Sequence, residues 1–266
     1  MHRAVWLTDL HLNHCQDDYV EAFFSDVKHC RPDSILVSGD FSESFQLLRY
    51  LRWMDAYFEC PIYFVLGNHD FYFSKIGYMR SKVEELCEES ERLVYLSSKD
   101  PIRLTDQVGL IGHDGWADGR IGDFARSVVM MHDYTLIDDL SGLKKGERWE
   151  VLKQLGDEAA KHVRATLPIC LEQFGESILL THVPPLREAC WHEGHISDDE
   201  WAPHFTCKAV GDAILEIMPQ YPAKKLTVYC GHTHGSGTTE PLPNVKIVTG
   251  GATYGRPGIS RVIELS

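Results

Sequence analysis

The strongest constraint on the fold of this chain is a recurring pair of features: a short apolar run of the strand type, followed by a small polar motif. The first three runs lie at residues 4–7, 35–37 and 62–66, and segments with helical apolar spacing at 20–27 and 47–54 separate them. Such alternation predicts parallel strands joined by crossover helices. We therefore expect an α/β protein whose polar motifs lie at the carboxyl ends of its strands, where open α/β sheets collect ligands.

The rest of the chain continues the alternation of helices and strands. Residues 78–89, 147–174 and 210–218 have helical composition, with Pro168 expected to bend or end the second helix and Pro219 to stop the third. Further strands are expected at 93–96, 102–104, 108–111, 177–180, 226–230, 245–248 and 261–265, of which the last four form a second sheet.

Residues 114–145 interrupt this pattern, because they have neither helical nor strand periodicity. We expect an insertion there, which is either a cap over the site or a surface excursion. No repeat or low-complexity linker divides the chain, so a single domain over residues 1–266 is expected.

Composition narrows the class of protein. With 26 Lys and Arg against 39 Asp and Glu, a net charge of −13 argues against an extended nucleic-acid surface. No apolar run reaches the roughly 18 residues of a membrane span. The eight cysteines form no CxxC pair, and a cleaved signal peptide would remove the motif that begins at Asp9. These features favour a reduced, cytoplasmic protein.

The polar motifs consist of residues that bind metal ions. They are Asp-Leu-His at 9–11, Gly-Asp at 39–40, Gly-Asn-His-Asp at 67–70, Thr-His at 181–182 and Gly-His-Thr-His at 231–234. Residues two positions apart, such as Asp9 and His11, point the same way along an extended segment and can bind one ion. The two oxygens of Asp40 can bridge two cations.

The motif at 67–70 offers an amide, an imidazole and a carboxylate in succession. Asn68 can bind a second metal, and His69 can face the leaving group as a general acid. Asp70 can fix the orientation of that imidazole and favour its protonated form. Taken alone, the motif also fits a simple Gly-Asn turn.

Three further histidines, His182, His232 and His234, complete the set. A lone histidine after a strand is usually a surface or core residue, but three of them beside the earlier residues are hard to assign to chance. Oxygen and nitrogen ligands suit two divalent or trivalent ions, with manganese as our first expectation and iron, zinc or cobalt as alternatives. Two such ions activate a water for in-line attack on phosphorus.

In this order, and across nearly the whole chain, the five motifs resemble those of the calcineurin-like metallophosphoesterases. The resemblance implies a four-layer αββα sandwich of two mixed β-sheets flanked by helices, with a di-metal site at the strand ends. It implies that the first metal is bound by Asp9, His11 and His234, the second by Asn68, His182 and His232, and both by Asp40. It also implies that His69 stabilises charge on the phosphate and leaving oxygens, oriented by Asp70.

Departures from known subgroups narrow the branch. The stretch after Asp40 is Phe-Ser-Glu-Ser, whereas the Ser/Thr protein phosphatases have Asp-Arg-Gly there. The motif at 67–70 ends in Asp70, whereas theirs ends in Glu. Glu43 stands where purple acid phosphatases have a metal-binding Tyr, and His69 where the lipid A precursor hydrolases have Arg. The chain is closest in pattern to the bacterial-type phosphodiesterase and phosphohydrolase branch, which includes cyclic-nucleotide phosphodiesterases.

We therefore expect a metal-dependent phosphoester hydrolase that acts on a small-molecule substrate, with a slight preference for phosphodiesters of the nucleotide type. A phosphomonoesterase acting on a nucleotide or sugar phosphate is the enzymatic alternative. A non-catalytic protein-interaction scaffold with the same fold is the alternative from another class.

Three groups of residues beyond the motifs are secondary candidates. For the group that contains Trp116, we favour a turn around a packed tryptophan over a wall of the pocket. For the group of three histidines, we favour surface positions over site residues. The three arginines can bind the anionic part of a substrate. The groups are His113, Asp114 and Trp116, then His192, His195 and His204, then Arg120, Arg126 and Arg187.

Overall fold

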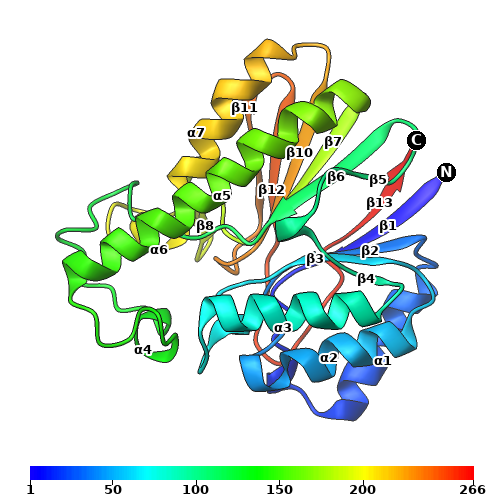
Figure 1. Ribbon diagram of the computed structural model, residues 1–266, viewed down its shortest axis with the longest axis horizontal. Coiled ribbons are helices and arrows are strands. Elements are labelled where there is room, and N and C mark those ends of the chain that lie inside the picture. The colour runs from blue at the N-terminus through cyan, green and yellow to red at the C-terminus, as the bar shows by residue number, and fades with distance from the viewer.

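Two mixed β-sheets pack face to face between helices in the computed structural model, which describes residues 1–266 (Figure 1). The first sheet has the strand order β13-β1-β2-β3-β4 and the second β11-β12-β10-β7-β6-β5. The four-layer αββα arrangement implied by the family resemblance is confirmed. The strands are β1 His2–Leu7, β2 Ser34–Ser38, β3 Ile62–Val65, β4 Leu93–Tyr95, β5 Ile102–Arg103, β6 Val108–His113, β7 Glu176–Thr181, β10 Lys225–Cys230, β11 Gly237–Leu242, β12 Val245–Thr249 and β13 Arg261–Leu265, with β8 Trp191–His192 and β9 His195–Ile196 as a separate hairpin.

Helices cover the outer face of each sheet. The first three pack on the first sheet, and α5 and α7 pack on the second (Figure 1). The apolar side chains spaced along α1 are buried, as their helical period predicts. The helices are α1 Asp17–His29, α2 Ser44–Tyr57, α3 Ile76–Glu89, α4 Asp133–Leu136, α5 Lys145–Gln173, α6 Ala202–Phe205 and α7 Lys208–Ile217, with single 3-10 turns η1 Leu12–His14, η2 His69–Phe71, η3 Leu96–Ser98, η4 Arg187–Ala189 and η5 Met218–Gln220.

Alternate side chains of a single strand enter different apolar cores. In β1, Val5 and Leu7 face the helices, whereas Trp6 faces the second sheet. There Trp6 contacts Tyr229 of β10, with ring centroids 4.6 Å apart. Because successive strand residues point to opposite faces, a strand buried on both sides reads as a continuous apolar run. The core between the sheets therefore fixes one set of strand ends beside the other.

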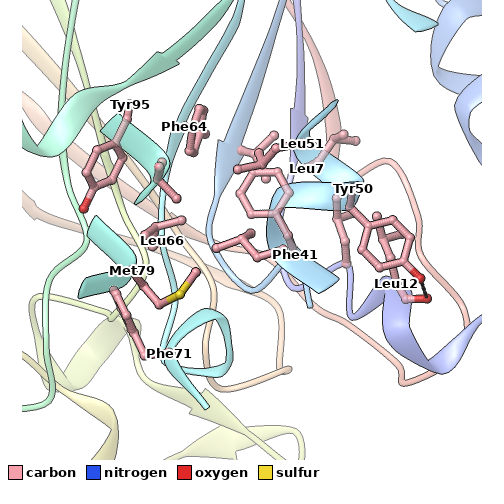
Figure 2. Packing of buried hydrophobic residues seen from close by; sticks show 14 of the residues in the cluster. Leu7, Leu12, Phe41, Tyr50, Leu51, Phe64, Leu66, Phe71, Met79 and Tyr95 are labelled. Carbon is pink, nitrogen blue, oxygen red and sulfur yellow. Dashed lines mark hydrogen bonds between the residues drawn. The ribbon is translucent and has the colours of Figure 1, made fainter. Parts of the chain in front are cut away.

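The core beneath the first sheet anchors the loops that follow β1 and β2 (Figure 2). Phe41 packs edge-on against Phe64 of β3, with ring centroids 5.5 Å apart. The hydroxyl of Tyr50, in α2, donates a hydrogen bond to the carbonyl of Leu12 at 3.0 Å. The loops that carry the first polar motifs are thus held by buried contacts just beyond the motif residues.

Two strand expectations differ from the structure. Residues 261–265 form β13, which joins the first sheet antiparallel to β1 rather than the second sheet. An ion pair of 2.7 Å between Arg3 and Glu264 crosses this pairing. The apolar pattern of a strand does not specify its sheet, because both sheets offer an edge. Strand β11, antiparallel to β12, was not expected, since Gly237–Leu242 contains a proline and few apolar residues.

Helix α5 continues through Pro168, so of the two expected effects of this proline, a bend or an end of the helix, the end is wrong. Packing outweighs the missing donor, because Val163, Leu167 and Leu171 are buried in the core that α5 shares with α7 and the second sheet. The hydroxyl of Thr166 also donates to the carbonyl of His162 at 2.9 Å, one turn below.

The irregular segment 114–145 docks against the loop after β3. The amide of Phe73 donates to the carbonyl of Leu136 at 2.6 Å, and Ser74 forms a parallel bridge with Ile137. Part of this segment is therefore fixed beside the loop that contains Asn68 and His69. No helix is both long enough and apolar enough to cross a membrane.

Candidate metal centre

The motif residues cluster at the carboxyl ends of five parallel strands. These strands are β1, β2 and β3 of the first sheet and β7 and β10 of the second. Each is followed within four residues by at least one predicted ligand. Since the sheets pack face to face, the loops of both sheets converge on one region, as the strand-end pattern predicts.

Left-handed backbone conformations, rather than strand alternation, bring the ligands together. Eight residues other than glycine have positive φ, and five of them are Asp9, His11, Asp40, His232 and His234. Such conformations are uncommon outside glycine, and they gather where function over-determines the backbone. The expectation that Asp9 and His11 share one side of an extended segment is therefore wrong in its geometry, because both lie in the turn after β1.

The first cluster contains Asp9, His11, Asp40 and His234, whose ligand atoms all lie within 4.8 Å of one another. The Nε2 atoms of His11 and His234 are 3.0 Å apart, and Nε2 of His234 is 3.5 Å from Oδ1 of Asp9. Two nitrogens bound to one octahedral ion at about 2.1 Å would lie about 3.0 Å apart. The spacing therefore suits a shared metal ion.

The second cluster contains Asn68, His182 and His232. Oδ1 of Asn68 lies 3.0 Å from Nε2 of His182 and 2.9 Å from Nδ1 of His232. The other nitrogen of each ring donates to a carbonyl, His182 to Ser38 at 2.9 Å and His232 to His204 at 3.0 Å. In their neutral forms both imidazoles thus direct a lone pair at an amide oxygen, and a cation among these acceptors satisfies all three.

Asp40 links the two clusters through one oxygen. Its Oδ2 lies 3.7 Å from Nε2 of His11 and 3.4 Å from Nε2 of His182. Its Oδ1 instead accepts a hydrogen bond of 2.9 Å from the amide of His69. A backbone donor therefore fixes the carboxylate with its other oxygen turned toward both clusters.

The electrostatics of the clusters favour a positive charge beside Asp40. Burial opposes the charged form of His182, but the carboxylate of Asp40 outweighs it and raises the pKa of His182 to about 10. Burial and the positive charge of His182 lower the pKa of His232 to about 3, and burial lowers that of His11 to about 2. His11 and His232 are thus neutral, the form that binds metal ions.

Asp70 has a different role from the expected one. Its carboxylate accepts hydrogen bonds from the amides of Asp40 and Gly67, both at 2.9 Å, and of Ser42 at 3.0 Å. It makes no hydrogen bond to the imidazole of His69, so it does not orient that ring directly. Burial, together with the charge of Asp40, raises the pKa of Asp70 well above its usual range. Asp70 instead ties the loops after β2 and β3 together.

The loop after β3 also requires a glycine at position 67. A Cβ on Gly67 would collide with the carboxylate of Asp40 and lie 2.6 Å from the Asp40 amide nitrogen. The loop after β3 therefore approaches the bridging carboxylate as closely as a backbone can, which is the usual reason for glycine at such a position.

His69 lies half-buried beside the first cluster, with its ring centroid 4.6 Å from that of His11. The hydroxyl of Tyr254 is 3.4 Å from its Nε2. Tyr254 also packs on His11, with ring centroids 4.4 Å apart. No sequence pattern indicates this tyrosine, because it belongs to an irregular loop between β12 and β13 and to none of the motifs.

Asp133 reaches the second cluster from the segment 114–145. Its Oδ1 accepts hydrogen bonds of 2.8 Å from Nδ2 of Asn68 and from the hydroxyl of Tyr72. Met131 of the same segment lines the cavity described below. Met131 and Asp133 of this segment thus lie beside the second cluster and the cavity.

A cavity of about 430 Å³ opens beside the two clusters. This volume lies within the range of small-molecule sites, roughly 300–1,000 Å³. No Lys or Arg is present among its lining residues, which are Asp40, Asn68, His69, Met131, His192, Glu193, Trp201, Phe205, His232, Thr233, His234 and Tyr254.

The secondary candidates divide between site and scaffold. Trp116 is packed on Phe71, as the turn interpretation predicts. His192 lines the cavity and His204 is buried against Ser127 and Tyr134, so for these two the surface interpretation is wrong. His195 is exposed, as the surface interpretation predicts, and His113 and Asp114 are buried outside the cavity. Each of the three arginines forms an ion pair with an aspartate: Arg120 with Asp157, Arg126 with Asp123 and Arg187 with Asp199.

Asp114 is a buried anchor for the loop after β3. Its Oδ1 accepts from the amide of Leu66 at 2.8 Å, and its Oδ2 accepts from Nε of Arg80 at 2.9 Å and from the hydroxyl of Tyr95 at 2.6 Å. Burial opposes ionisation, but Arg80 outweighs it and lowers the pKa of Asp114. This carboxylate joins β6 of the second sheet to β3 and α3.

The four-layer fold and the two clusters joined by one aspartate define a metal-dependent phosphoester hydrolase. The family model described as calcineurin-like phosphoesterase matches residues 2–236. The chain belongs to this family.

Comparisons with individual proteins agree with this assignment. A probable cyclic nucleotide phosphodiesterase of Synechococcus sp. is 30% identical over 145 residues, which are 47% of this chain and 53% of that protein, so the match spans about half of the relative. A phosphopantetheinyl hydrolase structure from Mycobacterium tuberculosis has a TM-score of 0.62 and 16% identity, over 93% of this chain and 89% of that one. A dimetal phosphatase structure from Danio rerio has a TM-score of 0.59 and 13% identity, over 96% and 89%.

Proposed function

We propose that this protein is a dinuclear phosphodiesterase that hydrolyses a P–O bond of a small, nucleotide-like phosphodiester. The observation that carries the proposal is the position of Asp40 Oδ2, within 3.7 Å of one cluster and 3.4 Å of the other, beside the cavity. In this proposal Asp9, His11 and His234 hold one ion, Asn68, His182 and His232 hold the other, and Asp40 holds both. Bound ions there would polarise phosphoryl oxygens and lower the pKa of a water molecule.

His69 is the proposed proton donor in this reaction. Its imidazole lies in the cavity beside the first cluster, where it can protonate an alkoxide leaving group. The hydroxyl of Tyr254, 3.4 Å from Nε2 of His69, can hold that ring toward the substrate. No serine or cysteine nucleophile lines the cavity.

Charge favours a diester over a monoester. A phosphodiester carries one negative charge, whereas a monoester dianion carries two and is usually bound by additional Arg or Lys. The cavity lining contains neither residue. The Synechococcus relative, named as a probable cyclic nucleotide phosphodiesterase, supports the same choice. The monoesterase and the non-catalytic scaffold remain the alternatives, and the complete ligand set argues against the scaffold.

The test compares an aryl phosphodiester with the matching monoester, using EDTA-treated protein refilled separately with Mn, Fe, Zn or Mg. We expect faster metal-dependent turnover of the diester, with Mn the most effective, and its loss in Asp40→Ala but not in the exposed-site control Asp26→Ala. Preference for the monoester would overturn the diester proposal. Full metal occupancy without turnover of either substrate would support the scaffold.

Alanine at His69 separates enzyme from scaffold by a second route. An enzyme should lose turnover of a poor leaving group by about 10²- to 10⁴-fold while it keeps its metal ions. A scaffold should show no measurable change.

We also propose that the protein works in the cytoplasm. Its eight cysteines are unpaired, and four of them, Cys170, Cys190, Cys207 and Cys230, are buried. Free buried thiols are typical of reducing compartments. Fractionation of cells expressing the tagged protein tests this: recovery from an oxidising compartment would contradict the proposal.

A further inference from the structure

One wall of the cavity beside the metal clusters is aromatic. It consists of His192, Trp201 and Phe205, which we call the aromatic shelf. The rings of Trp201 and Phe205 stack with centroids 5.4 Å apart and planes 25° from parallel. His192 packs against both, with ring centroids 5.3 Å from Trp201 and 5.0 Å from Phe205. None of the polar motifs contributes a residue to the shelf.

The shelf begins at the second cluster and extends away from it. Phe205 packs edge-on against the ring of His232, with centroids 5.4 Å apart, and Trp201 lies one ring further along. A group attached to a phosphate at the clusters would therefore pass over Phe205 before it reached Trp201. One aromatic ring, that of Phe205, thus lies between the second cluster and Trp201. In a nucleotide, one ribosyl group likewise lies between the phosphate and the base.

Two local structures hold the shelf in place. His192 ends β8, and the tight turn at Glu193 and Gly194, with φ of 48° and 82°, returns the chain through β9. Trp201 precedes α6, where Oδ1 of Asp198 accepts a hydrogen bond of 3.0 Å from its amide. Trp201 is nevertheless 37% exposed. A large, partly exposed aromatic side chain thus lines the cavity.

The charge of the cavity restricts what the shelf can bind. The cavity lining has no Lys or Arg, and Glu193 lies next to the shelf in sequence and in the same lining. A second phosphate near the shelf would meet this carboxylate without a compensating cation, so a polyphosphate is disfavoured. A neutral ring that offers N–H or O–H donors suits the same position, because a carboxylate accepts hydrogen bonds.

We propose that the aromatic shelf is the subsite for the planar base of a nucleoside phosphodiester that carries a single phosphate, with the base stacked on Trp201. This inference rests on the proposed phosphodiesterase function and specifies its substrate class. Aromatic side chains stack on any base, because every base has a π-face. The shelf therefore selects for the presence of a flat ring more than for the identity of the base.

The test is a binding comparison that does not depend on turnover. Adenosine 5′-monophosphate and ribose 5-phosphate have the same phosphate and sugar and differ only by the base, and calorimetry on manganese-loaded protein gives both dissociation constants. Stacking on one aromatic residue changes affinity by roughly 5- to 150-fold. We expect the nucleotide to bind at least about tenfold more tightly in the wild-type protein.

Variants locate this preference. Trp201→Ala should bring the two ligands to within about threefold, Trp201→Phe should keep most of the preference, and the control Tyr78→Ala, at a 58%-exposed site on α3, should keep all of it. Equal binding of the two ligands by the wild-type protein would contradict the proposal that the aromatic shelf binds a base. An undiminished preference in Trp201→Ala would contradict it as well.

The two proposals can fail separately. Hydrolysis of phosphodiesters without any preference for the nucleotide would leave the proposed function intact and remove the shelf. A tenfold preference that depends on Trp201, in a protein that hydrolyses no phosphodiester, would keep the shelf and overturn the proposed function.

Discussion

Asp133 determines which atom of Asn68 faces the second cluster. Oδ1 of Asp133 accepts a hydrogen bond of 2.8 Å from Nδ2 of Asn68, so the amide oxygen of Asn68 must point toward His182 and His232. The two residues are 65 positions apart, and Asp133 is the first residue of the short helix α4, within the otherwise irregular segment 114–145. A ligand motif is therefore oriented by a residue far outside it.

The first prediction concerns this contact. In Asp133→Ala the amide of Asn68 is free to turn its nitrogen toward the cluster, and we expect the second metal ion to bind about 10- to 100-fold more weakly, the usual effect of removing such a partner. Metal titration followed by calorimetry measures the change. Asp138→Ala, an exposed aspartate in the same segment, serves as the control. Unchanged affinity for the second ion would mean that other contacts orient Asn68.

The second prediction separates Asp70 from His69. Asp70 accepts three backbone hydrogen bonds and none from the imidazole, so Asp70→Asn places an amide N–H₂ against a backbone donor. We expect the variant to lose about 1–3 kcal/mol of unfolding free energy and to bind metal more weakly. Its kcat should keep the pH profile of the wild-type protein.

His69→Ala should behave in the opposite way. Its stability should stay close to that of the wild-type protein, while the part of the pH profile that reports the general acid should disappear. Urea unfolding and pH-dependent kinetics on both variants decide the matter. A shifted acid limb in Asp70→Asn would restore the direct orienting role that the sequence suggested.

That the proposed ligands lie together could be predicted from sequence because each follows closely on an apolar strand. A strand fixes the position of its last residue, and the carboxyl ends of parallel strands lie together whatever the rest of the fold does. The residues that orient and enclose the ligands could not be predicted in this way. Asp133 begins a single short helical turn, and Trp201 and Tyr254 lie in irregular segments, so their positions depend on contacts with residues far apart in the chain.

The errors in the fold have the same origin. The period of residues 261–265 predicts a strand but not its partner, and in the structure that partner is β1 of the first sheet. Pro168 is unfavourable for a helix taken alone, yet α5 gains more from burying Leu167 and Leu171 than it loses at that one position. Local propensity is overridden where a long buried surface favours the other outcome.

The third prediction is a pH dependence of stability that arises outside the metal centre. Burial lowers the pKa of His113 from 6.5 to about 3 in the folded protein. Its Nδ1 accepts a hydrogen bond of 3.1 Å from the amide of Gly115, and its Nε2 lies 4.0 Å from Glu158. Asp114, Arg80 and His162 are the other ionisable groups that act on it.

The sign follows from proton uptake. Between pH 6.5 and pH 3 the unfolded chain binds a proton at His113 that the folded protein does not, so stability is complete above pH 6.5 and falls as the pH drops toward 3. This one residue should account for about 2 kcal/mol between pH 7 and pH 5. Urea unfolding of wild-type protein and His113→Gln at both pH values measures the difference. Equal pH slopes in the two proteins would contradict it.

The fourth prediction concerns removal of the metal ions. The clusters hold two buried carboxylates, Asp9 and Asp40, and imidazole and amide acceptors that face one another at about 3 Å, so bound cations should stabilise the folded state selectively. At a free metal concentration 100 times the dissociation constant, one site adds about 2.7 kcal/mol to the unfolding free energy. We therefore expect the melting temperature of EDTA-treated protein to rise as manganese is added. In Asp40→Ala most of this rise should be lost, because both clusters use that residue, whereas Asp26→Ala should show the full rise. A rise of the same size in Asp40→Ala would show that manganese stabilises the protein at some other place.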